Sequence, residues 1–249
     1  MKTDREAPIG VFDSGVGGLT VAREIMRNLP SEKIVYFGDT ARVPYGSKSK
    51  ETVIRYSRQI IRFLQEQQVK AIVIACNTAS AFALDAVRGE FDLPIIGVIE
   101  PGAKVAAAQT RNKKVGVIGT VGTIGTGIHA EYLKSLDPEI TVYGKACPLF
   151  VPLVEEGWLH DPVTDEVVAR YLKELQEKDI DTLILGCTHY PLLRSTIRKI
   201  MGDQVCLVNP AYETALELGR LLKEKELSGT GTVQADFPYR FYVSDLADE

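Results

Sequence analysis

The feature that most constrains the fold of this chain is a repeated segment that ends, in both copies, in a cysteine. The first copy runs from Leu64 through an apolar stretch to Cys76, and the second runs from Leu175 to Cys187 over the same spacing. Polar residues follow both cysteines at once, namely Asn77, Thr78, Thr188 and His189. A buried strand that stops there places its thiol at the open edge of a sheet. The repeat therefore predicts two thiols that face one site from two related halves.

Two further pairs of segments extend the repeat. Residues 9–14 resemble residues 115–120, and residues 33–38 resemble residues 139–144, at one common offset. The two cysteines lie a few residues beyond that offset, which indicates a small insertion. Because the period is as long as a domain, it predicts two similar domains and not a solenoid.

Short apolar runs alternate with amphipathic stretches along the chain. The runs are rich in Val and Ile and nearly continuous in hydrophobicity, which is typical of parallel strands covered on both faces. We expect strands at 8–12, 33–37, 71–75, 95–98, 114–118, 140–143, 181–185, 205–208 and 239–243. We expect helices at 18–29, 50–68, 79–89, 101–110, 124–136, 163–178, 191–201 and 211–225. The predicted fold class is α/β, with open, mainly parallel sheets flanked by helices.

Composition excludes several classes of function. The 249 residues are 45% hydrophobic and 25% charged, as in an ordinary globular protein. The formal charge of −4, without a cluster of Lys and Arg, argues against a nucleic-acid partner. Residues 1–8 are polar and lack the apolar core of a signal peptide, and no apolar stretch approaches the length of a membrane span. We therefore expect no membrane association.

The cysteines and histidines indicate the compartment and argue against a metal. Four cysteines without an export signal are typical of reduced thiols in the cytoplasm, where we place the protein. The sequence has no Cys-x-x-Cys pair and its three histidines are scattered, so no metal ion is expected. Cys147 and Cys206 have no counterpart in the repeat, and we assign both to packing.

Polar residues that follow the strands are the candidates for function, because the ligand crevice of an open parallel sheet lies beyond the carboxyl ends of its strands. They are Asp13, Ser14, Asp39, Thr40, Cys76, Asn77, Thr78, Thr120, Cys187, Thr188 and His189. Several of them would serve equally well as helix N-caps. The glycine-rich turn after Asp13 suits an anion, but Thr20 replaces the third glycine of the dinucleotide fingerprint, so nucleotide binding is not favoured.

A pair of opposed thiols suits one reaction class especially well. Both Cys76 and Cys187 are expected where a strand leads directly into a helix, and a helix N-terminus favours the thiolate, which is the reactive form of cysteine. Inverting a stereocentre by proton transfer requires removal of a proton from one face and delivery of a proton to the other. Two thiols can exchange these roles for the reverse reaction. Asn77, Thr78, Thr188 and nearby backbone amides are candidates to hold a carboxylate and stabilise the carbanion.

Four segments of the chain closely resemble bacterial glutamate racemases, which belong to the aspartate/glutamate racemase family. The segments are 13–20, 44–46, 75–79 and 185–191, and the likeness runs along essentially the whole chain in the same order. The resemblance implies a cofactor-independent racemase that interconverts L- and D-glutamate and supplies D-glutamate for peptidoglycan. It also implies two domains related by pseudo-twofold symmetry, at 1–97 plus 209–249 and at 98–208, with the active site between them.

The resemblance assigns roles to individual residues. Cys76 corresponds to the base that deprotonates D-glutamate, and Cys187 to the base that acts on L-glutamate. Asp13 and His189 resemble the groups that assist Cys76 and Cys187 respectively. The implied substrate-binding residues are Asp13, Ser14, Tyr45, Gly46, Asn77, Thr78, Thr188 and His189, to which Thr120 and Glu155 are added.

Two of these assignments depend on the resemblance. The charge pattern alone would make Glu155 a surface residue. Pro44 fixes a turn in which Gly46 allows close approach of the backbone, so that N–H groups there can donate to the side-chain carboxylate of the substrate. Without the resemblance, an ordinary loop turn would be the preferred interpretation of Tyr45 and Gly46.

Other interpretations of the motifs remain open. The nearest is a racemase of aspartate or a related acid on the same fold, because pocket length is not readable from sequence. A thiol redox sensor with a disulfide between Cys76 and Cys187 and a two-lobed amino-acid-binding module belong to different classes. A pyridoxal-phosphate racemase would need a lysine in the site, and no strand-end motif carries one. A homodimer is expected only because such assemblies are common.

Overall fold

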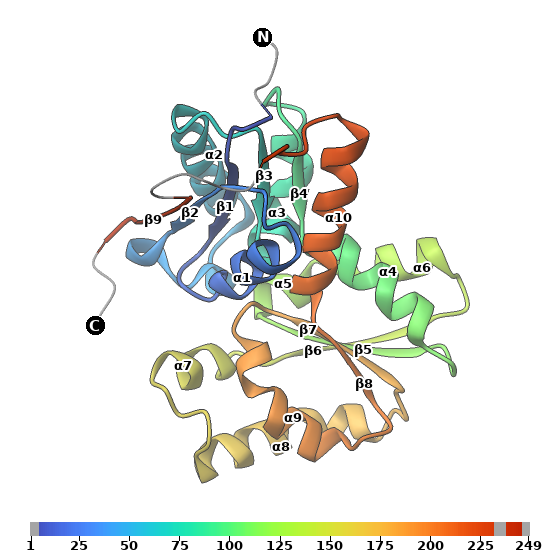
Figure 1. Cartoon of the computed structure of the whole chain (residues 1–249). Coiled ribbons are helices and arrows are strands. Elements are labelled where there is room, and N and C mark those ends of the chain that lie inside the picture. Colours follow the sequence, from blue (N-terminus) through green and yellow to red (C-terminus); the bar gives the residue numbers. More distant parts are fainter. Residues whose placement is uncertain (1–4, 232–237, 246–249) are drawn as a thin grey trace. The chain divides into compact units, whose positions relative to one another are not determined.

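The computed structural model describes residues 5–231 and 238–245, and the chain divides into two compact units (Figure 1). Unit 1 comprises Met1–Val98 with Ala211–Glu249, and unit 2 comprises Ile99–Pro210. Each unit contains one sheet whose neighbouring strands all run parallel. The predicted α/β class is confirmed.

Unit 1 is built on a five-stranded sheet with the order β4-β3-β1-β2-β9. Its strands are β1 (Ile9–Asp13), β2 (Ile34–Gly38), β3 (Ala71–Ile74), β4 (Ile95–Gly97) and β9 (Tyr239–Val243). Its helices are α1 (Leu19–Asn28), α2 (Lys50–Glu66), α3 (Asn77–Arg88) and α10 (Pro210–Glu224), which belongs to unit 1 from Ala211 onward. Two short 3₁₀ helices, η1 (Thr40–Arg42) and η2 (Tyr45–Ser47), follow β2.

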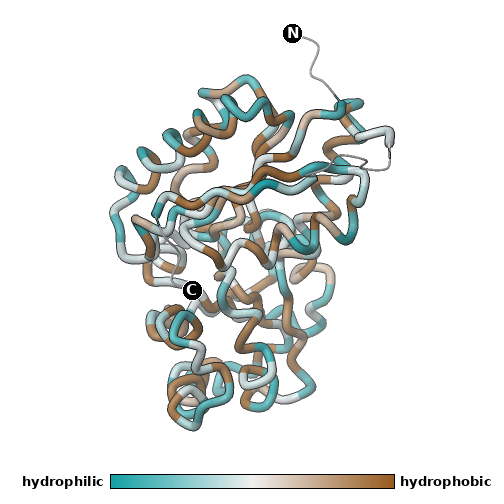
Figure 2. Tube along the Cα trace, turned by 60° about the vertical axis from the view of Figure 1, so that its left-hand side comes forward, coloured by the Kyte–Doolittle hydropathy of each residue, from teal (hydrophilic) through white to brown (hydrophobic). Residues whose placement is uncertain are grey.

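Alternating side chains of the unit 1 strands pack against two layers of helices. Ile9 and Val11 of β1 belong to one buried cluster with α1 and α10, whereas Phe12 belongs to a second cluster with α2 and α3. This alternation follows from the two-residue period of a strand and leaves both faces of the sheet covered. Figure 2 shows that hydrophobic and hydrophilic residues alternate along the helices, as expected of helices that turn one face toward a sheet.

Unit 2 is built on a four-stranded sheet with the order β6-β5-β7-β8. Its strands are β5 (Lys114–Gly119), β6 (Thr141–Ala146), β7 (Thr182–Gly186) and β8 (Cys206–Val208). Its helices are α4 (Ile99–Gln109), α5 (Val121–Gly125), α6 (Ile128–Leu136), α7 (Phe150–Glu155), α8 (Pro162–Gln176), the 3₁₀ helix η3 (Tyr190–Leu193) and α9 (Arg194–Met201). One buried cluster joins the sheet to α8 and α9, and another joins it to α4 and α6.

The two sheets repeat one topology. The order β4-β3-β1-β2 of unit 1 corresponds, in chain order, to β8-β7-β5-β6 of unit 2. Phe12 pairs with Ile74 and Ile118 pairs with Leu185, so the strands that lead to the two cysteines have the same register against the first strand of their unit. Cys76 and Cys187 therefore occupy corresponding positions.

The predicted repeat gives the wrong register for β6, the second strand of unit 2, against β5. The common offset between residues 33–38 and 139–144 would place Ile140 opposite Val115, as Ile34 lies opposite Ile9. Val142 pairs with Val115 instead. The connection that leads into β6 therefore holds additional residues, and the insertion is not confined to the segment before the cysteine.

Several helices differ from the sequence-based expectation. The single helix expected at 124–136 is interrupted by Gly127, which has a φ of 70°, a left-handed conformation that ends α5 and lets α6 begin. Helix α7 is absent from the sequence-based prediction. Helix α3 begins at Asn77, directly after Cys76, whereas Cys187 is followed by a turn and by η3 before α9 begins. The expectation that both cysteines meet a helix directly is thus correct for Cys76 only.

Among residues 5–231 and 238–245, no helix has the length and apolar character needed to cross a bilayer.

Candidate active site

Cys76 lies where β3 ends and α3 begins. It is the N-cap of α3, and its Sγ accepts a hydrogen bond from the backbone N–H of Ala79 at 3.4 Å. Asn77 and Thr78 form the first turn of the helix and are buried. Asn77 Oδ1 is buried without a hydrogen-bond partner among the described residues. The end of β3 thus presents a thiol, the backbone donors of a helix N-terminus and one unsatisfied acceptor.

Asp13 ends β1 and is fully buried. Its Oδ2 accepts a hydrogen bond from the backbone N–H of Gly15 at 3.0 Å. A Cβ atom on Gly18 would lie 2.4 Å from Asp13 Cβ, so the turn that encloses the carboxylate requires glycine at this position. The packing around Asp13 therefore explains why the motif has glycine at position 18.

Tyr36 of β2 lies near both Asp13 and Cys76. Its hydroxyl donates to the backbone carbonyl of Gly15 at 2.8 Å. Burial raises the pKa of Tyr36 well above its ordinary value, and the nearby Asp13 and Cys76 raise it further. The ends of β1 and β3 and a buried tyrosine of β2 thus form one polar neighbourhood, in which the phenol stays protonated.

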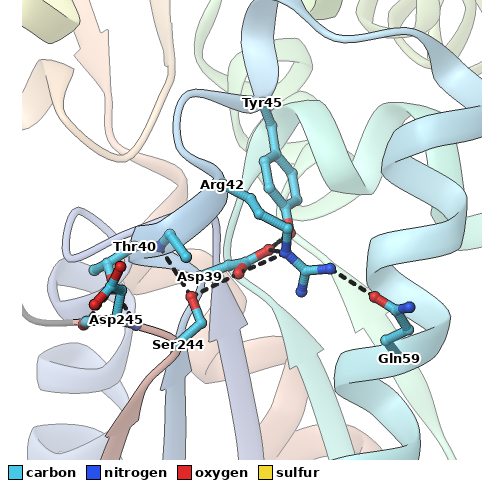
Figure 3. A network of polar contacts seen from close by, with 8 residues as sticks. Asp39, Thr40, Arg42, Tyr45, Gln59, Ser244 and Asp245 are labelled. Carbon is cyan, nitrogen blue, oxygen red and sulfur yellow. Dashed lines mark hydrogen bonds and ion pairs between the residues drawn. The ribbon is translucent and has the colours of Figure 1, made fainter.

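Tyr45 of η2 is buried in the same cluster as Cys76, and its hydroxyl donates a short hydrogen bond to Asp39 (Figure 3). Burial raises the pKa of Tyr45, and the hydrogen bond to Asp39 raises it further. Gly46 is half-buried beside it. A Cβ atom on Gly15 would lie 3.5 Å from the Val43 side chain, so the turn after Asp13 and Ser14 packs near the turn that carries Tyr45.

In unit 2, Cys187 is accompanied by a histidine and a glutamate. Cys187 Sγ lies 3.7 Å from His189 Nδ1, and the Oγ1 atom of Thr188 lies 3.4 Å from the same nitrogen. His189 Nε2 makes a short contact with Glu155 Oε1 of α7. The hydrogen bond with His189 lowers the pKa of Glu155, against the opposing effect of partial burial. The thiol of Cys187, the imidazole of His189 and the carboxylate of Glu155 thus lie in sequence, the first two buried and Glu155 exposed.

The neighbouring strand ends of unit 2 carry Thr120 and Cys147. Gly119 of β5 pairs with Gly186 of β7, which places Thr120 and Cys187 at adjacent strand ends. Thr120 is half-buried and caps α5, accepting the N–H of Thr123 at 3.2 Å. Cys147 follows β6 and is fully buried, and burial raises its pKa to about 12. Cys147 is accordingly a protonated packing residue.

Within each unit, the structure brings most of the expected site residues together. Unit 1 gathers Asp13, Tyr45, Cys76, Asn77 and Thr78, with Ser14 and Gly46 on the adjoining turns. Unit 2 gathers Cys187, Thr188, His189 and Glu155, with Thr120 at the next strand end. Among the described residues, no group of three or more His, Cys, Asp or Glu side chains could hold a metal ion.

Sequence reasoning missed the part that three residues play in ordering this neighbourhood. Tyr36 carries no signal, because a tyrosine in an apolar strand suggests only core packing. Asp39 is among the strand-end candidates, but no motif gives it a role. Arg42, whose Nε lies 2.7 Å from Asp39 Oδ2, belongs to a turn without a motif.

The family model described as Asp/Glu/Hydantoin racemase matches residues 9–215. The chain therefore belongs to this family of racemases, and the resemblance found in its motifs is confirmed. A protein of Geobacter metallireducens named glutamate racemase is 52% identical over 238 residues, which cover 96% of this chain and 87% of that protein.

Solved structures of glutamate racemases share the fold. An isoform from Bacillus anthracis superposes with a TM-score of 0.91 at 44% identity, covering 97% of this chain and 90% of that one. The enzyme from Francisella tularensis, solved in complex with D-glutamate, has a TM-score of 0.90 at 43% identity and covers 98% and 90%. These likenesses extend over nearly the whole length of both chains.

Proposed function

We propose that this chain is a glutamate racemase that works without a cofactor. The observation that carries the proposal is the pair of cysteines at corresponding ends of β3 and β7, each beside a different assisting group. Relatives named glutamate racemase support the choice of substrate, because they match almost the whole chain at about half identity. The Francisella relative with bound D-glutamate supports a free amino acid as ligand.

In the proposed reaction, the thiolate of one cysteine takes the Cα proton from one face of the amino acid. The thiol of the other cysteine gives its own proton to the opposite face, so one S–H bond forms while the other breaks and the total charge is unchanged. Cys76 acts as the base toward D-glutamate and Cys187 as the base toward L-glutamate. After each turnover the two sulfurs have exchanged protonation states, and the next substrate of opposite hand resets them.

The assisting groups differ between the two halves. Asp13 is a buried carboxylate near Cys76, and it can favour removal of a proton toward that side. His189 lies within reach of Cys187 and is held by Glu155, so it can supply or withdraw a proton at that sulfur. Such groups contribute to general acid–base catalysis when they are fixed close to the reacting atom.

The substrate is proposed to be held by groups at both strand ends. The α-carboxylate suits the N-terminal amides of α3 with Thr78 and Thr188, which also stabilise charge as the carbanion forms. The ammonium group would satisfy Asn77 Oδ1, which is buried without a partner in the described part of the chain. Backbone N–H groups of Tyr45 and Gly46 are proposed to receive the side-chain carboxylate, with Ser14, Thr120 and Glu155 contributing polar contacts.

The decisive experiment measures Cα proton exchange with both enantiomers in heavy water. Purified protein, without added cofactor, should bring either L- or D-glutamate to a racemic mixture and introduce deuterium at Cα. Circular dichroism follows the stereochemistry, and mass spectrometry follows the deuterium. Turnover of aspartate in preference to glutamate would identify the nearest alternative, a racemase of another acid.

The same assay separates the other classes. A binding module would bind glutamate without incorporating deuterium. A redox sensor would show a disulfide between Cys76 and Cys187 under oxidising conditions and no exchange at Cα. Cys76 and Cys187 are both free thiols in the structure, which is compatible with two-base chemistry.

The proposed role places the enzyme in a wider setting. D-Glutamate is a building block of peptidoglycan, and we infer that the chain supplies it. Because both thiols must stay reduced, we infer that the enzyme acts in the cytoplasm, where thiols are kept in that form. The homodimer stays a prediction, which sedimentation of the purified protein would test.

A further inference from the structure

Asp39 is the centre of a polar network in unit 1 that the proposed chemistry does not use (Figure 3). The residue follows β2 and is fully buried. Its backbone N–H donates to the carbonyl of Asp13 at 3.0 Å, which ties it to the end of β1. Its carboxylate accepts hydrogen bonds from Tyr45, from Arg42 Nε and from Ser244 Oγ. A buried carboxylate with three donors is well satisfied and fixes the groups around it.

Two of those donors lie in the consecutive 3₁₀ helices η1 and η2, with Arg42 in the first and Tyr45 in the second. Arg42 also donates to Gln59 of α2 at 2.5 Å, and its guanidinium lies 4.0 Å from the ring centroid of Tyr56. The ring of Tyr45 lies 5.8 Å from that of Tyr56. Helix α2 therefore supports the turn from one direction.

The other support comes from the far end of the sequence. Ser244 and Asp245 follow β9, the edge strand that pairs with β2. Ser244 Oγ donates to Asp39 Oδ1 at 2.8 Å and accepts from the backbone N–H of Ala41 at 2.9 Å. Thr40 Oγ1 donates a hydrogen bond to the backbone carbonyl of Asp245 at 2.8 Å. The same Thr40 Oγ1 accepts a hydrogen bond from the backbone N–H of Asp245 at 3.2 Å.

We propose that Ser244 and Asp245 are positioning residues that hold the Tyr45-Gly46 turn in its substrate-binding conformation, acting through Asp39 and Thr40. The inference rests on the proposed function, in which this turn receives the side-chain carboxylate of glutamate. Ser244 is the key contact, because one hydroxyl joins the buried carboxylate of Asp39 to the backbone at Ala41.

This arrangement predicts a specific kinetic signature. The side-chain carboxylate of glutamate carries the same charge in the ground state and in the transition state of Cα proton transfer. Contacts with it therefore contribute uniform binding, whose loss raises KM and leaves kcat nearly unchanged. A residue that merely stabilised the fold would not separate the two parameters in this way.

The test compares Ser244→Ala with the wild type for both enantiomers. Loss of a hydrogen bond to a charged group should raise KM for L- and D-glutamate alike by about tenfold, with kcat within about twofold. Peptide-level hydrogen–deuterium exchange should become faster over residues 39–48 and stay unchanged over β1 and α3. Ser244→Thr keeps the hydroxyl and should restore both readouts.

Ser135→Ala is the control, because it also removes a serine hydrogen bond, the one that Ser135 Oγ donates to the carbonyl of Tyr132 on α6, but in unit 2. Its KM and its exchange over residues 39–48 should equal those of the wild type. An unchanged KM in Ser244→Ala, or faster exchange throughout unit 1, would overturn the positioning role while leaving wild-type racemisation intact. A wild type that does not racemise glutamate would instead refute the proposed function, and exchange over residues 39–48 would still decide whether Ser244 holds the turn.

Discussion

Unit 1 and unit 2 share one sheet topology and differ most at the two ends of the strand that leads to the cysteine. At the carboxyl end, Cys76 caps a full α-helix, whereas Cys187 is followed by a turn in which His189 faces back to the sulfur. At the amino end, unit 1 has a buried ion pair and unit 2 has a carboxylate with uncharged donors. The strands set where each thiol lies, and the segments beyond them set its chemical surroundings.

The amino ends show this contrast most clearly. Lys70, directly before β3, is fully buried and pairs with Glu32 at 2.5 Å. Asp181, directly before β7, accepts hydrogen bonds from Thr110 Oγ1 at 2.7 Å and from the N–H of Arg111 at 2.6 Å. Removing one member of a buried ion pair leaves an uncompensated charge, so unit 1 is the more sensitive of the two at this end.

The largest expected effect tests what the two carboxyl ends have in common. Cys76→Ala and Cys187→Ala should each reduce racemisation by at least about a thousandfold, because each removes one of the two proton carriers of the proposed mechanism. Circular dichroism of glutamate measures the rate, and far-ultraviolet dichroism of the protein checks the fold. Cys147→Ala is the matched control and should keep its activity. Full activity in either of the first two variants would remove that sulfur from the mechanism.

The next effect tests the contrast at the amino ends. Lys70→Met should lower the free energy of unfolding by about 3–5 kcal/mol, because Glu32 is left buried and charged. Urea unfolding measures the change. Lys225→Met, at an exposed lysine of the same unit, should change stability by less than about 0.5 kcal/mol. Equal losses of unfolding free energy in Lys70→Met and Lys225→Met would mean that the buried ion pair does not make unit 1 especially sensitive at this end.

A third effect separates the two proposed assisting groups, Asp13 and His189. Asp13→Asn and His189→Asn should each lower kcat by about tenfold to a hundredfold. The equilibrium constant of racemisation is one, so kcat/KM must stay equal in the two directions. A difference between the roles of Asp13 and His189 therefore has to be measured by isotope effects. Asp13→Asn should raise the primary isotope effect with Cα-deuterated D-glutamate, and His189→Asn should raise it with the L form. Identical isotope effects in both variants would show that the two halves are not specialised.

The smallest effect concerns a buried histidine of unit 2. Burial lowers the pKa of His129 from 6.5 to about 4, so the unfolded chain binds a proton first as the pH falls. The neutral, buried histidine therefore stabilises the fold fully only above the pKa that it has in the unfolded chain. The free energy of unfolding falls by about 2 kcal/mol between about pH 7.5 and about pH 5. His129→Leu should remove that part of the acid sensitivity, measured by urea unfolding at both pH values. The same change at exposed His160 should leave the sensitivity as it is.

The strands could be predicted from sequence to within a few residues. Continuous runs of Val, Ile and Leu, such as residues 71–75 and 181–185, already indicate buried parallel strands. The helices were less predictable where they are short. Helix α7 has six residues and contains Pro152, so it lacks the apolar period that reveals a longer helix.

The candidate site was predictable where it depends on topology alone. Cys76, Asp13 and His189 follow or end strands, and the rule that ligands bind beyond carboxyl strand ends selects them without coordinates. Contacts between distant segments were not predictable in this way. Ser244 and Asp39 are 205 positions apart, and neither carries a motif that points to the other.

The raised pKa of Cys147 has a practical consequence for chemical modification. Alkylating reagents react with thiolates, and at neutral pH this sulfur is both enclosed and protonated. Activity lost after treatment with iodoacetamide can therefore be traced to the remaining sulfurs, and mass mapping needs to distinguish only the peptides that carry Cys76, Cys187 and Cys206.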